Sequence, residues 1–145
     1  MRLSATYAYG ASPEKVFAAL VDPAVLQKCI DGCEKMEKTG ESSYDAHLKI
    51  GVAGMKGSYV GKVRIEDQRP PESFTLQIEG KGVPGWVKGT AKIQISPENA
   101  GSELRCDADG QVGGLIAAVG SRLVEAAAKK MLDEFFRKLG EQLST

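Results

Sequence analysis

The chain lacks several features that would place it in a familiar functional class. Its 145 residues carry 19 basic and 19 acidic side chains, so no positive excess marks a nucleic-acid binder. No apolar run approaches the about 18 residues that span a bilayer, and the first residues lack the apolar stretch of a signal peptide. We therefore expect a single cytoplasmic domain over residues 1–145 that binds no nucleic acid.

Residues that hold metals or perform catalysis are equally scarce. His47 is the only histidine, and it falls on the polar side of an alternating segment. The cysteines are odd in number, and Cys29 and Cys33 are four residues apart, which is not the CxxC spacing of zinc or redox sites. No nucleophile–base motif is present. We expect no metal site, no catalytic residue and no covalently bound cofactor.

Glycine is abundant instead, with 17 residues against a usual share of roughly 7%. Between glycine and proline turns, the apolar residues predict a strand, two short helices, about six further strands and a long helix. The strand-like alternation covers residues 3–9, 44–52, 59–65, 74–78, 91–95 and 104–108. Helices are predicted after Ser12-Pro13, after Asp22-Pro23, and without interruption from Gly113-Gly114 to about Leu143. This order predicts an α+β fold with a curved antiparallel sheet of about seven strands around a long C-terminal helix.

The turns between the predicted strands form a polar set and an apolar set. In a meander, successive turns lie at alternating ends of the sheet, so residues 39–42, 67–72 and 96–99 share one end and are polar. The other end receives residues 51–57, 82–86 and 113–116, which are glycine-rich and apolar and include the only tryptophan. Turns normally face water. We therefore predict a hydrophobic rim at this end, formed by Val52, Met55, Val83, Pro84, Trp86, Leu115 and Ile116.

That rim has two interpretations. Exposed, it marks a ligand mouth, a partner site or a membrane contact. Folded inward, the same side chains plug the end of the core. With no net charge on the chain, we expect any membrane contact to be mainly hydrophobic.

Several segments resemble a known family. Residues 11–20 with Asp22-Pro23 are similar to the common opening of the START/Bet v 1-like (SRPBCC) superfamily. Within it, residues 29–34, 71–76, 85–91, 111–114 and 120–123 resemble the CoxG family of carbon monoxide dehydrogenase subunits. Asp31 departs from the proline that this family often has, which bears on the stiffness of that loop. The resemblance implies a helix-grip fold and an accessory protein without catalytic activity.

The resemblance also implies a function. Members of this family are associated with recruiting molybdenum-containing CO dehydrogenase to the membrane, and the fold encloses a hydrophobic cavity. We expect a lipid or quinone as ligand, peripheral contact with the inner face of the cytoplasmic membrane, and the rim as the mouth of the cavity. The residues expected to line the cavity are Leu48, Ile50, Tyr59, Leu76, Trp86, Ile93, Val119, Leu123 and Met131.

Two other functions stay open. The first is a cavity enzyme of the polyketide cyclase or dehydratase type, for which the candidate polar groups are Tyr7, Tyr9, Tyr44 and Tyr59. The second is a protein-binding adaptor without a ligand. An apolar cavity opening at Trp86 favours the carrier, clustered polar groups favour the enzyme, and a filled core favours the adaptor.

Overall fold

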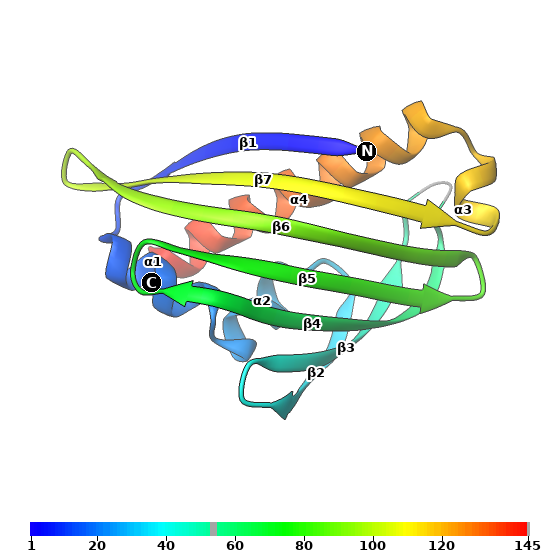
Figure 1. Cartoon of the computed structure of the whole chain (residues 1–145), viewed down its shortest axis with the longest axis horizontal. Coiled ribbons are helices and arrows are strands. Elements are labelled where there is room, and N and C mark those ends of the chain that lie inside the picture. Colours follow the sequence, from blue (N-terminus) through cyan, green and yellow to red (C-terminus); the bar gives the residue numbers. More distant parts are fainter. Residues whose placement is uncertain (53–54, 145) are drawn as a thin grey trace.

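The chain forms one curved antiparallel sheet wrapped around a long helix (Figure 1). The computed structural model describes residues 1–52 and 55–144, so residues 53–54 of the predicted apolar turn at 51–57 lie outside the described residues. The elements are β1 (Arg2–Tyr9), α1 (Pro13–Leu20), α2 (Pro23–Cys29), β2 (Cys33–Gly40), β3 (Ser43–Ile50), β4 (Gly57–Arg69), β5 (Ser73–Gly82), β6 (Gly85–Glu98), β7 (Gly101–Gly113), α3 (Leu115–Ala118) and α4 (Ser121–Leu143). The strand order β1-β7-β6-β5-β4-β3-β2 confirms the predicted fold class.

The two short helices begin where the sequence places a cap followed by proline. The Ser12 hydroxyl accepts a hydrogen bond from the Lys15 amide at 3.3 Å, and the Asp22 carboxylate accepts one from the Ala24 amide at 2.9 Å. Each cap satisfies an amide that the first helical turn leaves without a partner. Together α1 and α2 close one end of the grip, where the polar turns lie.

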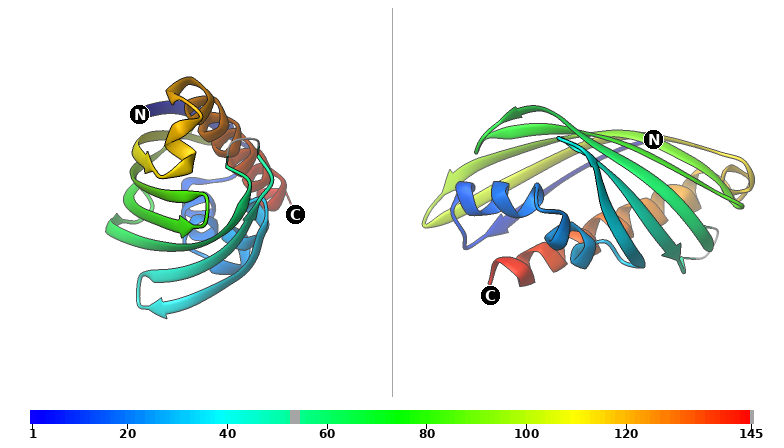
Figure 2. Two further views of the ribbon diagram at one scale, coloured as in Figure 1. Left: turned by 90° about the vertical axis from the view of Figure 1, so that its right-hand side faces the viewer. Right: turned by 90° about the horizontal axis from the view of Figure 1, so that it is seen from below.

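The core forms two clusters on the concave side of the sheet, where α4 crosses it (Figure 2). The first cluster lies at the α1 end and includes Val16, Phe74, Leu104 and Leu139. The second lies at the glycine-rich end and comprises Ile50, Met55, Tyr59, Ile116, Val124 and Ala127. The α4 backbone comes closest to α1, α2, α3 and β1. The middle strands of the sheet are farther from the α4 backbone, so contact with them is made by side chains of α4 and of the strands.

The C-terminal helix departs from the sequence prediction because it is interrupted. The short helix α3 is separated from α4 by Gly120, whose φ is +98°, and is preceded by Gly114, whose φ is +76°. A residue with a Cβ atom is strained in this conformation. The chain therefore turns twice at glycines, and the helical spacing through residues 113–143 does not describe one continuous face.

Candidate functional site

Seven of the predicted cavity-lining residues lie on the inside of the grip, but they do so in two groups. Ile50 and Tyr59 are buried in the second cluster, and three partly buried side chains pack against that cluster: Leu48, Val119 and Met131. Ile93 is buried in the first cluster, with Leu76 packed against it. The lining predicted as one continuous surface is therefore divided between the two ends of the concave face.

Trp86 does not line the interior, contrary to the prediction. Alternation along β6 points Ala91 and Ile93 into the core, so Trp86 points to the convex face, where its side chain is 42% exposed. Its indole covers Gly113 on the neighbouring strand, where a Cβ atom would collide with the ring. The interior therefore does not open at Trp86.

Leu123 does not line the interior either, contrary to the prediction. The buried stripe of α4 runs through Val124 and Ala127, and Leu123 precedes Val124 by one residue, about 100° around the helix. Leu123 is therefore 63% exposed. Because Leu123 lies four residues before Ala127, helical spacing alone does not separate it from the buried stripe.

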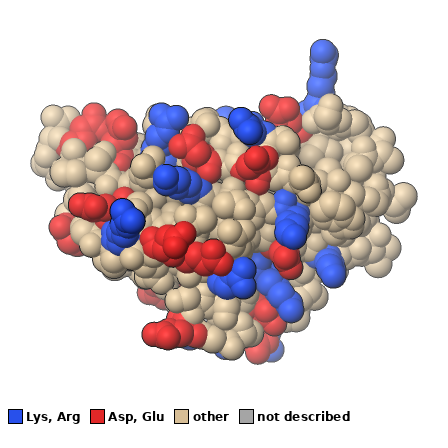
Figure 3. Space-filling model, in the orientation of Figure 1, with Lys and Arg blue, Asp and Glu red and all other residues tan. Residues whose placement is uncertain are grey.

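The predicted rim is partly buried and partly exposed, so each of the two interpretations holds for some of its residues. Met55 and Ile116 fold inward and are buried in the second cluster, while Val52 and Pro84 are half-buried. Val83 and Leu115 project outward, 93% and 69% exposed. We call the exposed set the apolar end; it comprises Val83, Trp86, Leu115 and Leu123. On the face shown in Figure 3, the right-hand tip of this end carries no charged side chains, and Lys and Arg side chains lie behind it.

Three chain segments meet at the apolar end. Pro84, in the β5–β6 turn, accepts a hydrogen bond from the Ile116 amide at 2.9 Å. A Cβ atom at Gly57 would touch the Pro84 ring, so the start of β4 lies against the same proline. The predicted convergence of the apolar turns is thus present in the structure, with Pro84 at its centre.

Between the two clusters, four glycine residues line the concave face of the sheet. Gly61, Gly80, Gly89 and Gly110 alternate in phase with buried residues of β4, β5, β6 and β7, so all four face inward. Gly61 pairs with Gly80, and Gly89 pairs with Gly110. We call these four residues the glycine patch. A Cβ atom built on Gly80 would have no neighbour within 4 Å, so the space above this strand is open.

Ile78, beside the glycine patch, is also exposed to solvent. Ile78 shares its face of β5 with the buried Phe74 and pairs with Val63 and Gly89, yet it is 37% exposed. An isoleucine on an inward face is normally covered by the opposing layer. The concave face is therefore apolar between the two clusters and uncovered at Gly80 and Ile78, while Leu48 lies against Gly61 and Met1 against Gly110.

The glycine patch was not among the predicted site residues, although the sequence carries a signal for it. Glycine weakens the interior of a strand and often marks a close approach of another backbone or a ligand. From the sequence alone, the abundant glycines are placed mainly in the turns between strands. The four glycines sit in phase with apolar residues of the alternating segments, and only the strand register brings them together.

The tyrosine hydroxyls, which were the candidate polar groups of an enzyme, are occupied by structural hydrogen bonds. Tyr9, Tyr44 and Tyr59 donate to backbone carbonyls, and Tyr7 donates to the Asp133 carboxylate at 2.8 Å. Burial raises the pKa of Tyr9 and of Tyr59, so neither is a ready proton donor. Across residues 1–52 and 55–144 no group of metal-ligating side chains occurs and no buried side-chain polar atom lacks a partner.

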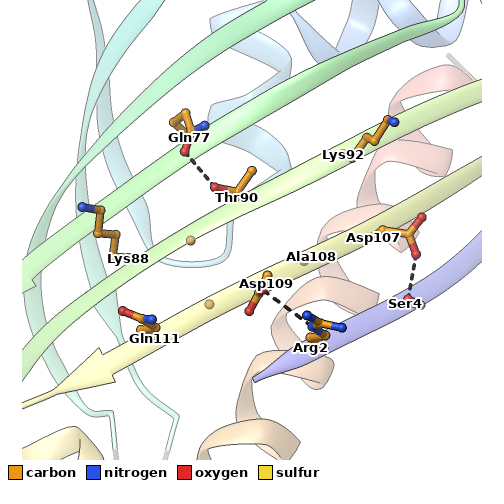
Figure 4. A pocket seen from close by; sticks show the side chains of 12 residues that line it. Arg2, Ser4, Gln77, Lys88, Thr90, Lys92, Asp107, Ala108, Asp109 and Gln111 are labelled. Carbon is orange, nitrogen blue, oxygen red and sulfur yellow. Dashed lines mark hydrogen bonds and ion pairs between the residues drawn. The ribbon is translucent and has the colours of Figure 1, made fainter.

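Two hollows lie on the outside of the grip. The larger, about 660 Å³, is on the convex face of β1, β5, β6 and β7 (Figure 4). Its polar side chains largely pair with one another: Ser4 donates to Asp107 at 2.7 Å, and Thr90 donates to Gln77 at 2.8 Å. The second hollow, between β1 and α4, contains the Tyr7–Asp133 pair. We interpret both as solvated grooves.

Comparison with known proteins identifies the family. Residues 8–144 match the family described as the CoxG subunit of carbon monoxide dehydrogenase. The crystal structure of a conserved protein from Geobacillus kaustophilus is 33% identical with a TM-score of 0.96, covering 99% of this chain and 95% of that chain. No curated protein sequence is significantly similar to the chain.

More distant structures share the fold alone. A START superfamily protein from Mycobacterium smegmatis is 14% identical with a TM-score of 0.77, covering 99% of this chain and 97% of that chain. Ara h 8.0201 is 13% identical with a TM-score of 0.73 over the same shares of the two chains. The chain therefore belongs to the CoxG family of carbon monoxide dehydrogenase subunits, whose role is accessory rather than catalytic, as predicted from the sequence.

Proposed function

We propose that this protein carries a lipid or quinone on the concave face of its sheet and couples a molybdenum CO dehydrogenase to the membrane. The observation that carries the proposal is the open glycine patch, with Ile78 exposed beside it. The family implies association with CO dehydrogenase, and an accessory subunit with an apolar binding face can bring a hydrophobic reactant to a soluble enzyme.

The glycine patch suits an apolar ligand. Its backbone amides and carbonyls lie in the ladders of a seven-stranded sheet, so the exposed surface of the patch is the flat face of peptide groups. The side chains around it, including Val63, Ile78 and Leu48, are apolar. Burying apolar ligand surface there contributes about 25 cal/mol for each Å² removed from water. The Met1 ammonium donates to the Gly110 carbonyl at 3.1 Å at the β7 side of the patch, and the apolar side chains elsewhere on this face favour a neutral molecule over an ionised one.

The apolar end supplies the membrane contact in this proposal. Its exposed side chains come from the β5–β6 turn, the edge of β6, α3 and the first turn of α4. Clustered exposed apolar residues mark partner or membrane surfaces. Among the described residues no helix is long and apolar enough to cross a membrane. The contact is therefore proposed as peripheral, with the second cluster between the bilayer and the glycine patch.

Native mass spectrometry and lipid extraction of protein purified from membranes test the carrier function. We expect a bound lipid or quinone in the wild type, and Gly80→Val should reduce its recovery at least ~10-fold, since the branched side chain fills the open space. Stability should not fall, because valine favours strands more than glycine does. Gly10→Val is the matched control, since Gly10 also has no neighbour within 4 Å but lies between β1 and α1.

Two results would contradict the proposal. One is wild-type protein that yields no lipid or quinone. The other is a Gly80→Val variant that retains as much ligand as the Gly10→Val control. In the first case a protein-binding adaptor becomes the better description, and in the second the ligand lies elsewhere on the fold.

A further inference from the structure

Three segments of this electrically neutral chain carry positive charge only. The segments 49–58, 80–88 and 110–124 contain none of the 19 acidic residues. They contain five of the 19 basic ones, which leaves 14 basic and 19 acidic residues for the rest of the chain. We call these five residues the basic collar; they are Lys49, Lys56, Lys81, Lys88 and Arg122.

The fold gathers the three segments at the apolar end. They contain the β3–β4 connection, the β5–β6 turn and the junction between β7 and α4, which meet around Pro84. All five collar residues are exposed, and within the described part of the chain none forms an ion pair. Acidic residues border the collar: Glu79 lies opposite Lys88 on β5, and Asp109 lines the same convex hollow as Lys88. Asp31 precedes Gly32, whose carbonyl accepts from the Lys49 amide. Figure 3 shows acidic side chains spread over the left and middle of this face and absent from the right-hand tip.

Apolar, aromatic and charged residues follow one another along the strands. Val83 occupies the β5–β6 turn itself and is almost fully exposed. Trp86 lies further back on β6, directly opposite Lys81. Lys88 follows two residues later on the same face, roughly 7 Å further from the turn. The same sequence of layers occurs from the bilayer interior outward, since tryptophan favours the interface and lysine the headgroup level.

We propose that the basic collar binds the anionic headgroups of phospholipids around the apolar end, so that the protein selects anionic membranes. This inference rests on the membrane contact proposed above and adds the lipid class that the contact prefers. The collar provides charge complementarity, because anionic leaflets attract clusters of about four to eight cations. A net charge of zero conceals this attraction, since the compensating acids lie elsewhere on the chain.

The layered arrangement favours a bilayer over an acidic protein partner. Val83 projects from the β5–β6 turn and Leu115 from the start of α3, which suits a fluid layer that closes around each side chain. A stable protein–protein interface requires a packed centre that excludes water. The apolar end has no such centre, because its larger inward side chains, Met55 and Ile116, are already buried in the core.

Vesicle co-sedimentation tests the inference, with vesicles of phosphatidylcholine alone and of equal parts phosphatidylcholine and phosphatidylglycerol. The variant Lys56→Gln/Lys81→Gln/Lys88→Gln should lose roughly five-fold affinity for the anionic vesicles per lysine, about 100-fold in all at low salt. Its affinity for the neutral vesicles should not change. Lys28→Gln/Lys62→Gln/Lys130→Gln is the matched control, because it removes the same charge from exposed lysines outside the collar. Thermal unfolding of each variant verifies that it is folded.

Wild-type protein that binds both vesicle types equally overturns the inference and leaves the carrier function standing. Equal losses in the collar variant and the control also overturn it, since net charge alone would then explain the effect. Protein that binds no vesicle but captures an acidic protein through the collar overturns it in favour of a protein interface. Failure of the carrier function is recognised separately, by the absence of extracted lipid or quinone.

Discussion

Tyr7 illustrates how a polar side chain on the inner side of this fold is committed to structure. Its hydroxyl donates to Asp133, and its ring stacks on Phe136 with a centroid separation of 4.5 Å. Burial and the adjacent Asp133 carboxylate raise the pKa of Tyr7. Conversely, hydrogen bonds from Lys129 and then from Tyr7 hold the pKa of Asp133 below its ordinary value. The pair ties the edge strand β1 to α4.

Tyr7→Phe should destabilise the protein in a pH-dependent way. A carboxyl whose pKa is lowered by folding contributes stability above its unfolded pKa and loses that contribution as pH falls through the folded value. At neutral pH we expect a loss near the lower end of about 0.5–1.5 kcal/mol, since Asp133 is half exposed. The difference between wild type and variant in urea unfolding should shrink below the ordinary pKa of aspartate. A difference independent of pH would mean that the hydroxyl acts through packing alone.

At the scale of elements, the junction between α3 and α4 separates what faces inward from what faces outward. Gly120 lets the chain change direction after Val119, so that Ile116 and Val124 both reach the second cluster. Leu115 and Leu123, each one residue before a buried neighbour, are left on the surface. The break therefore supplies part of the apolar end.

Gly120→Ala should therefore destabilise the protein by about 1–2 kcal/mol, because alanine at a φ of +98° is strained. The cost is conformational, since a Cβ atom at Gly120 would have open space around it. Gly10→Ala has similar space without a positive φ and should leave the free energy of unfolding unchanged or slightly raised. Equal stabilities of the two variants in urea unfolding would contradict this explanation of the break.

The α3–α4 junction also shows why the prediction of one uninterrupted helix after Gly113-Gly114 was wrong. Residues 115–143 are apolar at helical spacing, and glycine is tolerated within such a pattern. Nothing in the spacing distinguishes a helix that contains Gly120 from two helices separated by it. The two short N-terminal helices were predictable because Ser12-Pro13 and Asp22-Pro23 combine a cap with a residue that cannot continue a preceding helix.

At the scale of the whole molecule, the sheet separates two surfaces with different roles in the proposed function. The concave face carries the glycine patch, and the apolar end with its basic collar lies at one edge of both faces. Trp86 is the only tryptophan and lies on the convex side of that end. It therefore reports on the apolar end in the intact protein.

Binding to vesicles should shift the fluorescence of Trp86 to shorter wavelength, because its indole moves from water into the membrane interface. Val83→Ser/Leu115→Ser should reduce the shift with little change in thermal stability, since both side chains are exposed. Ile116→Ser should instead lower the melting temperature, because Ile116 is buried in the second cluster. If the exposed pair proves as destabilising as Ile116→Ser, those side chains belong to the core and the membrane contact must be sought elsewhere.

The sequence by itself determined the order and type of the elements except for the break at Gly120, the ends at which polar and apolar turns lie, and the family. These follow from local patterns, since periodicity and caps act over a few residues and alternate turns of a meander share an end. Only the tertiary structure decided which residues become neighbours. The register of four strands assembled the glycine patch, and the meeting of three segments concentrated five cations in a neutral chain. Each of these depends on contacts between residues far apart in the sequence, which local patterns do not encode.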